Sequence, residues 1–161
     1  MYTHEIAGFA LLDVFSYSEL EHVGEVTDWF EADDQWMVLK NEFKSKEHED
    51  VFSYMLIADN KIHDVDIEIK IHFNFPDDKL LETLLLVNKR NELFNSYGVY
   101  LDVDERLLLI RSTINLAGYS SSDAFDGFDF AKVQKEALFN LLVDVFWEIE
   151  NIRSHFPFDS R

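Results

Sequence analysis

The sequence predicts an α+β fold: an antiparallel sheet with helices packed on one face, in the element order α-β-β-β(-β)-α-β-β-α. Three observations predict it. One central segment alternates strictly between apolar and polar residues, short polar turns separate the strand-like segments, and helical periodicity is confined to three segments. Consecutive strands joined by turns, with few helical crossovers, are typical of antiparallel sheets.

The clearest predicted strand is Val65–Phe75, which Pro76 ends. Its apolar positions fall on one face, and they are Val65, Ile67, Ile69, Ile71, Phe73 and Phe75. The positions between them are polar, and they are Asp66, Glu68, Lys70, His72 and Asn74. This alternation predicts a sheet with one face buried under helices and one face in water.

The other predicted strands are no longer than this one and are rich in aromatic and β-branched residues. They are Glu25–Glu31, Gln35–Phe43, Val51–Ala58, Val99–Val103 and Arg106–Leu116. Turns are expected around Ala32–Asp34, Asp59–Lys61 and Asp104–Glu105. The polar stretch Lys40–Asp50 is interpreted as a hairpin loop or a ragged strand end.

Three helices are expected from apolar residues at helical spacing. The first covers Thr3–Tyr17, with a further helical turn after Ser18. The second runs from Asp77–Asp78, whose charges suit a helix N-terminus, to about Asn95. The third is a long helix from Phe128 or Phe130 to His155, preceded by a polar loop from Gly118 to Gly127.

Composition and charge restrict the function. The chain has 161 residues, no Cys, and 14 Lys and Arg against 32 Asp and Glu, a formal charge of −18. One domain over residues 1–161 is expected, because no linker or repeat divides the chain. The charge opposes binding to nucleic acid and anionic membranes. The N-terminus lacks the pattern of a secretory signal, so a cytoplasmic protein is expected.

Catalytic and metal-binding patterns are weak. The best metal-like cluster is formed by His63, Asp64, Asp66, Glu68 and His72, but alternating acids are also typical of a solvated strand face. Asp102, Asp104 and Glu105 resemble the start of a calcium loop, yet the required Gly is replaced by Leu107. We therefore expect no catalytic residues, no metal and no cofactor, although paired carboxylates for acid–base chemistry stay an open alternative.

Aromatic residues exceed what a small core requires, at 15% of the chain. A sheet with one covered face leaves some of them outside unless a partner covers them. Either the helices bury all of them, or some form a partner or dimer interface. The residues predicted for that interface are Trp29, Trp36, Phe43, Phe139, Phe146 and Trp147.

Three segments of the second half carry a family resemblance: Leu80–Asn91, Gly98–Asp104 and Leu107–Leu116. Together they resemble the YbjN family and the related type III secretion chaperones of the CesT type. The resemblance covers roughly Val65–Ile152 and depends on apolar pattern together with Asn88, Asn91, Gly98 and Asp102. It implies an α+β fold, a homodimer, no catalysis, and for the chaperone branch the binding of extended segments of effector proteins.

The leading hypothesis is therefore a non-catalytic cytoplasmic domain that binds a segment of a partner protein and forms a homodimer. The alternative is an acidic immunity-type or mimic protein that inhibits a basic toxin or a nucleic-acid-binding enzyme. Its acidic surface would accelerate association and make the complex sensitive to salt.

Overall fold

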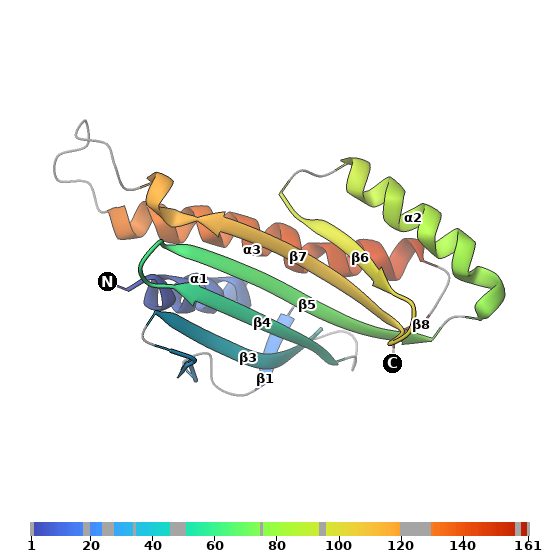
Figure 1. The fold of residues 1–161 in the computed structure, drawn as a ribbon, viewed down its shortest axis with the longest axis horizontal. Helices are drawn as coiled ribbons and strands as arrows, with labels where there is room; N and C mark the ends of the chain where they lie inside the picture. Colours follow the sequence, from blue (N-terminus) through green and yellow to red (C-terminus); the bar gives the residue numbers. More distant parts are fainter. Residues whose placement is uncertain are drawn as a thin grey trace.

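The chain folds into an antiparallel sheet backed by helices, as a computed structural model shows (Figure 1). The structure describes residues 2–17, 20–23, 28–33, 35–45, 51–74, 76–93, 96–119, 130–156 and 159–160. Within these ranges the sheet has eight strands in the order β1-β3-β4-β5-β7-β6, with β2 paired to β3 and β8 paired to β5. The predicted α+β class is confirmed.

Helices occupy one side of the sheet and one of its edges. Helix α1 (Thr3–Tyr17) and helix α3 (Phe130–His155) run behind the sheet, and α2 (Leu80–Leu93) lies beside the edge strand (Figure 1). Short 3-10 turns precede α2 (η1, Asp77–Lys79) and follow β7 (η2, Leu116–Tyr119). The three predicted helices are thus present, with the second beginning as a 3-10 turn.

The strands fall into four long or medium central strands and four short ones. The central strands are β3 (Trp36–Ser45), β4 (Val51–Asp59), β5 (Asp64–Asn74) and β7 (Leu107–Asn115). The shorter strands are β1 (Leu20–Val23), β2 (Phe30–Glu31), β6 (Gly98–Asp102) and β8 (Asp159–Ser160). All pairs are antiparallel.

The core lies between the sheet and the two helices behind it. The apolar positions of β5 from Val65 to Ile71 are buried, as the alternation predicts. Aromatic rings fill one end of this layer: Phe43 and Phe146 meet edge to face with ring centroids 4.8 Å apart, and Tyr54 packs beside both. Burying one large apolar side chain contributes about 1.5–3 kcal/mol, so this layer dominates the stability of the fold.

Several predicted boundaries were wrong. Leu20–Val23 pairs with Glu42–Ser45 as strand β1, where a helical turn after Ser18 was expected. Within the predicted strand Glu25–Glu31, Phe30–Glu31 is strand, while residues 24–27 lie outside the described part. The polar stretch after Lys40 continues β3 to Ser45, and residues 46–50 are not described. Sheet pairing outweighs the polar composition of these segments.

Helix α2 combines apolar packing through Val87 with a buried polar contact to α3. The Arg90 guanidinium donates two hydrogen bonds of 2.7 Å to the carboxylate of Glu148 on α3, and the Tyr97 hydroxyl donates a third. Glu148 is fully buried. Burial and the bond to Glu148 raise the pKa of Tyr97, which keeps its hydroxyl protonated as a donor. This buried pair fixes α2 against α3.

The next residue along α2 closes the edge of the sheet. The side-chain amide of Asn91 donates to the Val99 carbonyl at 2.8 Å and accepts from the Val99 N–H at 2.7 Å. It therefore satisfies both backbone groups that β6 directs away from β7. Sheet edges left unpaired invite other strands, and Asn91 blocks that pairing at Val99.

Candidate functional site

The candidate site is the face of the sheet turned away from α1 and α3, which we call the open face. Within the described part of the chain, no helix covers it (Figure 1). Its central cross-strand row runs from Lys40 through Met55, Glu68 and Arg111 to Gly98. Such a row brings side chains from five strands side by side.

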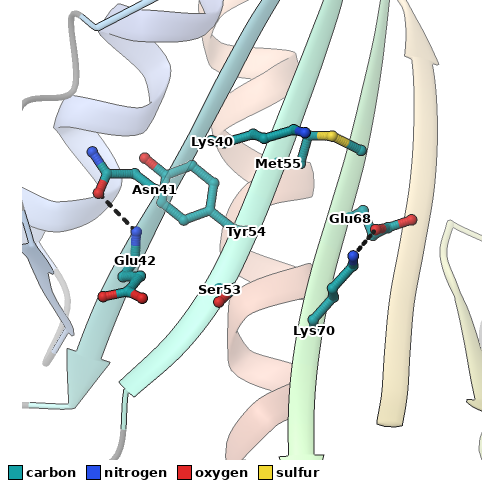
Figure 2. A pocket seen from close by; sticks show the side chains of 8 residues that line it. All are labelled: Lys40, Asn41, Glu42, Ser53, Tyr54, Met55, Glu68 and Lys70. Atoms are coloured by element: carbon teal, nitrogen blue, oxygen red, sulfur yellow. Dashed lines mark hydrogen bonds and ion pairs between the residues drawn. The ribbon is translucent and has the colours of Figure 1, made fainter. Parts of the chain in front are cut away.

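A hollow of about 550 Å³ occupies the middle of this face. Its lining comes from β3, β4 and β5, and comprises Lys40, Asn41, Glu42, Ser53, Tyr54, Met55, Glu68 and Lys70. Figure 2 shows the long side chains of Lys40, Met55 and Lys70 lying across the strands. The half-buried thioether of Met55 gives the hollow an apolar patch among charged groups.

Charges of both signs alternate around the hollow. Glu68 accepts a hydrogen bond of 2.9 Å from Arg111 Nε, and Lys70 Nζ lies 3.8 Å from its other oxygen. Lys40 is exposed, and no described residue forms an ion pair with it. In a chain of charge −18 this face therefore presents cations that a partner's acidic groups can reach.

A second hollow of about 550 Å³ lies where β6 begins. Its lining is mostly polar and comprises Asn91, Ser96, Tyr97, Gly98, Tyr100, Arg111, Ser112 and Thr113. The Arg111 guanidinium lies over the Tyr100 ring, 5.9 Å from its centroid. A Cβ at Gly98 would come within 2.5 Å of the Tyr100 hydroxyl, so glycine is required for this ring position. Arg111 thus pairs with Glu68, which lines the central hollow, and also lines this second hollow.

The six residues predicted for an interface do not gather in one place. Phe43 and Phe146 are buried against each other in the core, which corrects their assignment to a partner surface. Trp29 and Phe139 are partly buried and pack on the core. Trp36 is half-buried at the start of β3, where its position faces the open side. Trp147 is 61% exposed on α3.

The acids of the metal-like cluster have other partners. Asp64 accepts from Asn115, Asp66 accepts from Thr113, and Glu68 pairs with Arg111. Among the residues that the structure describes, no group of His, Asp and Glu has the arrangement that holds a metal ion. These carboxylates stabilise cross-strand pairs on the open face.

The residues that carry the family resemblance serve local structure. Asn91 binds Val99, Gly98 accommodates the Tyr100 ring, and Asp102 accepts the backbone N–H of Glu105 at the turn after β6. Asn88 is exposed on α2. Asn91, Gly98 and Asp102 thus hold the α2–β6–β7 region in shape, and Asn91 and Gly98 also line the second hollow.

Sequence reasoning missed the open-face residues around the two hollows. Lys40, Met55, Arg111 and Tyr100 occupy outward positions of their strands, whereas Glu68 and Lys70 were placed on the water-facing side by the alternation of Val65–Phe75. The signal was present in the alternation itself, because the polar half of each strand defines the opposite face. The sequence alone does not give the register of strand pairing, which decides which outward residues of neighbouring strands lie side by side.

Comparison of the chain with protein-family models, with curated proteins and with solved structures finds no match. No helix in the described ranges combines the length and the apolar character that crossing a bilayer requires. The function of this chain is therefore inferred from its own geometry.

Proposed function

We propose that this protein is a non-catalytic domain that binds a segment of a partner protein on the open face of its sheet. The observation that carries the proposal is the arrangement of the two hollows. Both lie on or beside the side of the sheet that the described helices leave uncovered, and Arg111 and its partner Glu68 connect them. A long, shallow, charge-mixed surface suits an extended polypeptide better than a compact small molecule.

The side chains in the hollows support binding rather than catalysis. Glu68 is already engaged by two cations, and Arg111 by Glu68 and the Tyr100 ring. The buried Glu148 and Tyr97 have mutual structural contacts that fix α2. A general base requires a free carboxylate or imidazole within reach of a substrate proton, and Glu68 and Glu148 are held in pairs. This leaves Glu42 as the other carboxylate in the lining of the central hollow.

The mixed charge of the open face favours this proposal over the acidic mimic. A mimic of nucleic acid presents rows of acids, whereas Lys40, Lys70 and Arg111 place cations at the centre of this face. Salt dependence separates the two. A mimic complex with a basic toxin weakens steeply as salt rises, while a segment held by a few cations together with apolar and backbone contacts weakens less.

The proposal is tested by capturing partners from the native host and measuring their affinity for charge-reversed variants. Lys40→Glu combined with Lys70→Glu places two acids in the central hollow, and we expect at least about a tenfold loss of affinity. Lys89→Glu combined with Lys132→Glu changes the net charge equally on exposed helix positions and serves as the control. Equal binding by both double variants would refute the open face as the binding surface.

The predicted homodimer and cytoplasmic location stay predictions. The exposed Trp147 lies one turn after the exposed Val143 on α3, which gives the dimer a candidate contact separate from the open face. Sedimentation equilibrium of the chain and of Trp147→Ala measures the oligomeric state directly. A monomer at high concentration would remove the dimer from the proposal without affecting the open face.

A further inference from the structure

We propose that the partner segment adds to the sheet as an extended strand on the edge of β7 at Ser112–Asn115, in the second hollow. This inference rests on the proposed function and specifies where and how the partner's main chain is held. It starts from the unequal lengths of two neighbouring strands. Strand β6 pairs with β7 no further than Gly98 opposite Arg111, while β7 continues to Asn115 (Figure 1).

The direction of the backbone groups along β7 follows from Asn91. Both backbone groups of Val99 bind the Asn91 side chain, so Val99 and its partner Ile110 do not exchange backbone hydrogen bonds. In an antiparallel pair the bonded residues alternate, so Arg111 and Leu109 direct their backbone groups toward β6. By the same alternation, Thr113 directs its N–H and C=O to that side.

A hydrogen bond on the opposite side of β7 confirms this alternation of backbone directions. The Leu116 N–H donates to the carbonyl of His63, on the β5 side, so even-numbered positions here point toward β5. Thr113 therefore presents its N–H and C=O away from β5, beyond the last residue paired with β6. Within the described ranges no strand pairs with this part of the edge, and Thr113 lines the second hollow.

Parts of the other sheet edges are covered. Strands β1 and β2 pair with Glu42–Ser45 and Met37–Val38 of β3, and Asn91 occupies the edge of β6 at Val99. Proteins close their edges because unpaired backbone groups recruit other strands. An edge that no described strand pairs, beside a polar hollow of about 550 Å³, fits an added strand.

The chemistry of the hollow defines the occupant. An extended polypeptide antiparallel to β7 would continue the line of β6 and would exchange N–H and C=O bonds with Thr113. Ser96 and Ser112 line the same space with small side chains, and the Ser112 hydroxyl donates to the Ser96 carbonyl. The Arg111 guanidinium borders the same space, so a segment with an acidic residue near the Thr113 pairing fits best.

The free edge is tested first in the chain alone, by amide hydrogen exchange followed with NMR. The Thr113 amide should exchange much faster than the amides of Ser112 and Ile114, which face β5. A Thr113 amide as protected as its neighbours would overturn the proposal, because the edge would then already be occupied. This measurement requires no variant.

Binding is tested with linear dodecapeptides selected from a random phage-displayed library on the full chain. Thr113→Pro removes the outward N–H without removing a bond to β5, and Thr113→Ala keeps that N–H while losing the hydroxyl contact to Asp66. We expect Thr113→Pro to weaken the selected peptides at least about tenfold and Thr113→Ala to leave them nearly unchanged. The bound peptide should also slow exchange at Thr113.

The outcomes separate this inference from the proposed function. In one outcome, peptides or a captured partner bind Thr113→Pro as well as the original chain and still lose affinity for the variant with Lys40→Glu and Lys70→Glu. This result would overturn the strand addition, and the open face would remain the proposed binding surface. Failure of any peptide or partner to bind would overturn both. If Thr113→Pro does not fold, absence of Thr113 protection by bound peptide in the original chain overturns the strand addition.

Discussion

The two faces of the sheet are built from different side chains. The face under α1 and α3 consists of apolar and aromatic residues, with Phe43, Leu56 and Ile69 fully buried. The open face alternates Lys40, Glu68 and Arg111 along the same strands and register. The difference indicates that one face determines the stability of the fold, while the other can change with little effect on it.

This difference between the two faces makes the open face suitable for tests of partner binding. Residues that are not needed for packing can be replaced without unfolding the chain, so a loss of partner binding there can be attributed to the contact itself. Substitutions on the two faces should accordingly differ in their effect on the free energy of unfolding, and the largest effect is expected in the aromatic core.

Phe43→Ala should destabilise the fold by about 3–5 kcal/mol, because it leaves a cavity among Phe52, Tyr54 and Phe146. Lys40→Ala, three residues earlier on the open face, is the matched control and should change stability by about 0.5 kcal/mol or less. Urea unfolding followed by circular dichroism measures both. Similar losses for the two variants would contradict the division between the faces.

Glu148→Ala should cost about 3–5 kcal/mol, because it leaves the Arg90 guanidinium and the Tyr97 hydroxyl without their buried acceptor. Replacing both charges, with Arg90→Met and Glu148→Leu together, should recover the part of that loss that comes from the unpaired guanidinium, while the Tyr97 hydroxyl stays without this acceptor. Denaturant unfolding of Arg90→Met, Glu148→Leu and the double variant gives the coupling energy between the two positions. Additive losses would show that the pair does not hold α2 against α3.

Asp59 should make the fold sensitive to acid. Burial alone would raise the pKa of Asp59, but the N–H groups of Ile62 and Lys61 and the amide of Gln35 lower it. A lowered pKa in the folded state stabilises the fold above the unfolded value of about 3.9, and this contribution is lost as pH falls through the folded pKa.

Asp59→Asn removes this contribution, so it should cost about 1–3 kcal/mol at neutral pH. The difference between the two proteins should shrink as the pH falls below about 4. Unfolding free energies measured across this range test the prediction. A cost independent of pH would mean that geometry rather than charge stabilises the turn after β4.

Replacing the central cations with neutral residues should have the smallest effect on stability. Lys40→Gln and Lys70→Gln should each change the free energy of unfolding by about 0.5 kcal/mol or less, because both side chains are exposed and Lys70 pairs loosely with Glu68. Thermal unfolding checks this. A larger loss would show that the open-face charges are needed for the fold.

The covered face was largely predictable from the sequence, because alternation and helical spacing report local burial. Val65–Ile71 and the long apolar stripe of α3 were assigned correctly for this reason. Leu20–Val23 was misassigned as helical because its strand character comes from pairing with Glu42–Ser45, a contact that local composition does not encode.

The candidate site was less predictable, because it depends on register. Phe43 and Phe146 were expected outside, and no local pattern shows that two residues so far apart in the sequence meet each other. Glu148 lies on the buried stripe between Val145 and Ile152, a position that could have revealed a buried partner for it. Arg90 as that partner required the fold.

The central claim, that partners bind the open face, is tested most directly by protection of single cysteines. The chain has no Cys, so Ser53→Cys in the central hollow or Asn140→Cys on the exposed side of α3 creates a unique thiol. Alkylation rates are measured with and without the captured partner. Protection of the cysteine at 53 but not at 140 is predicted, and the reverse pattern would contradict the account.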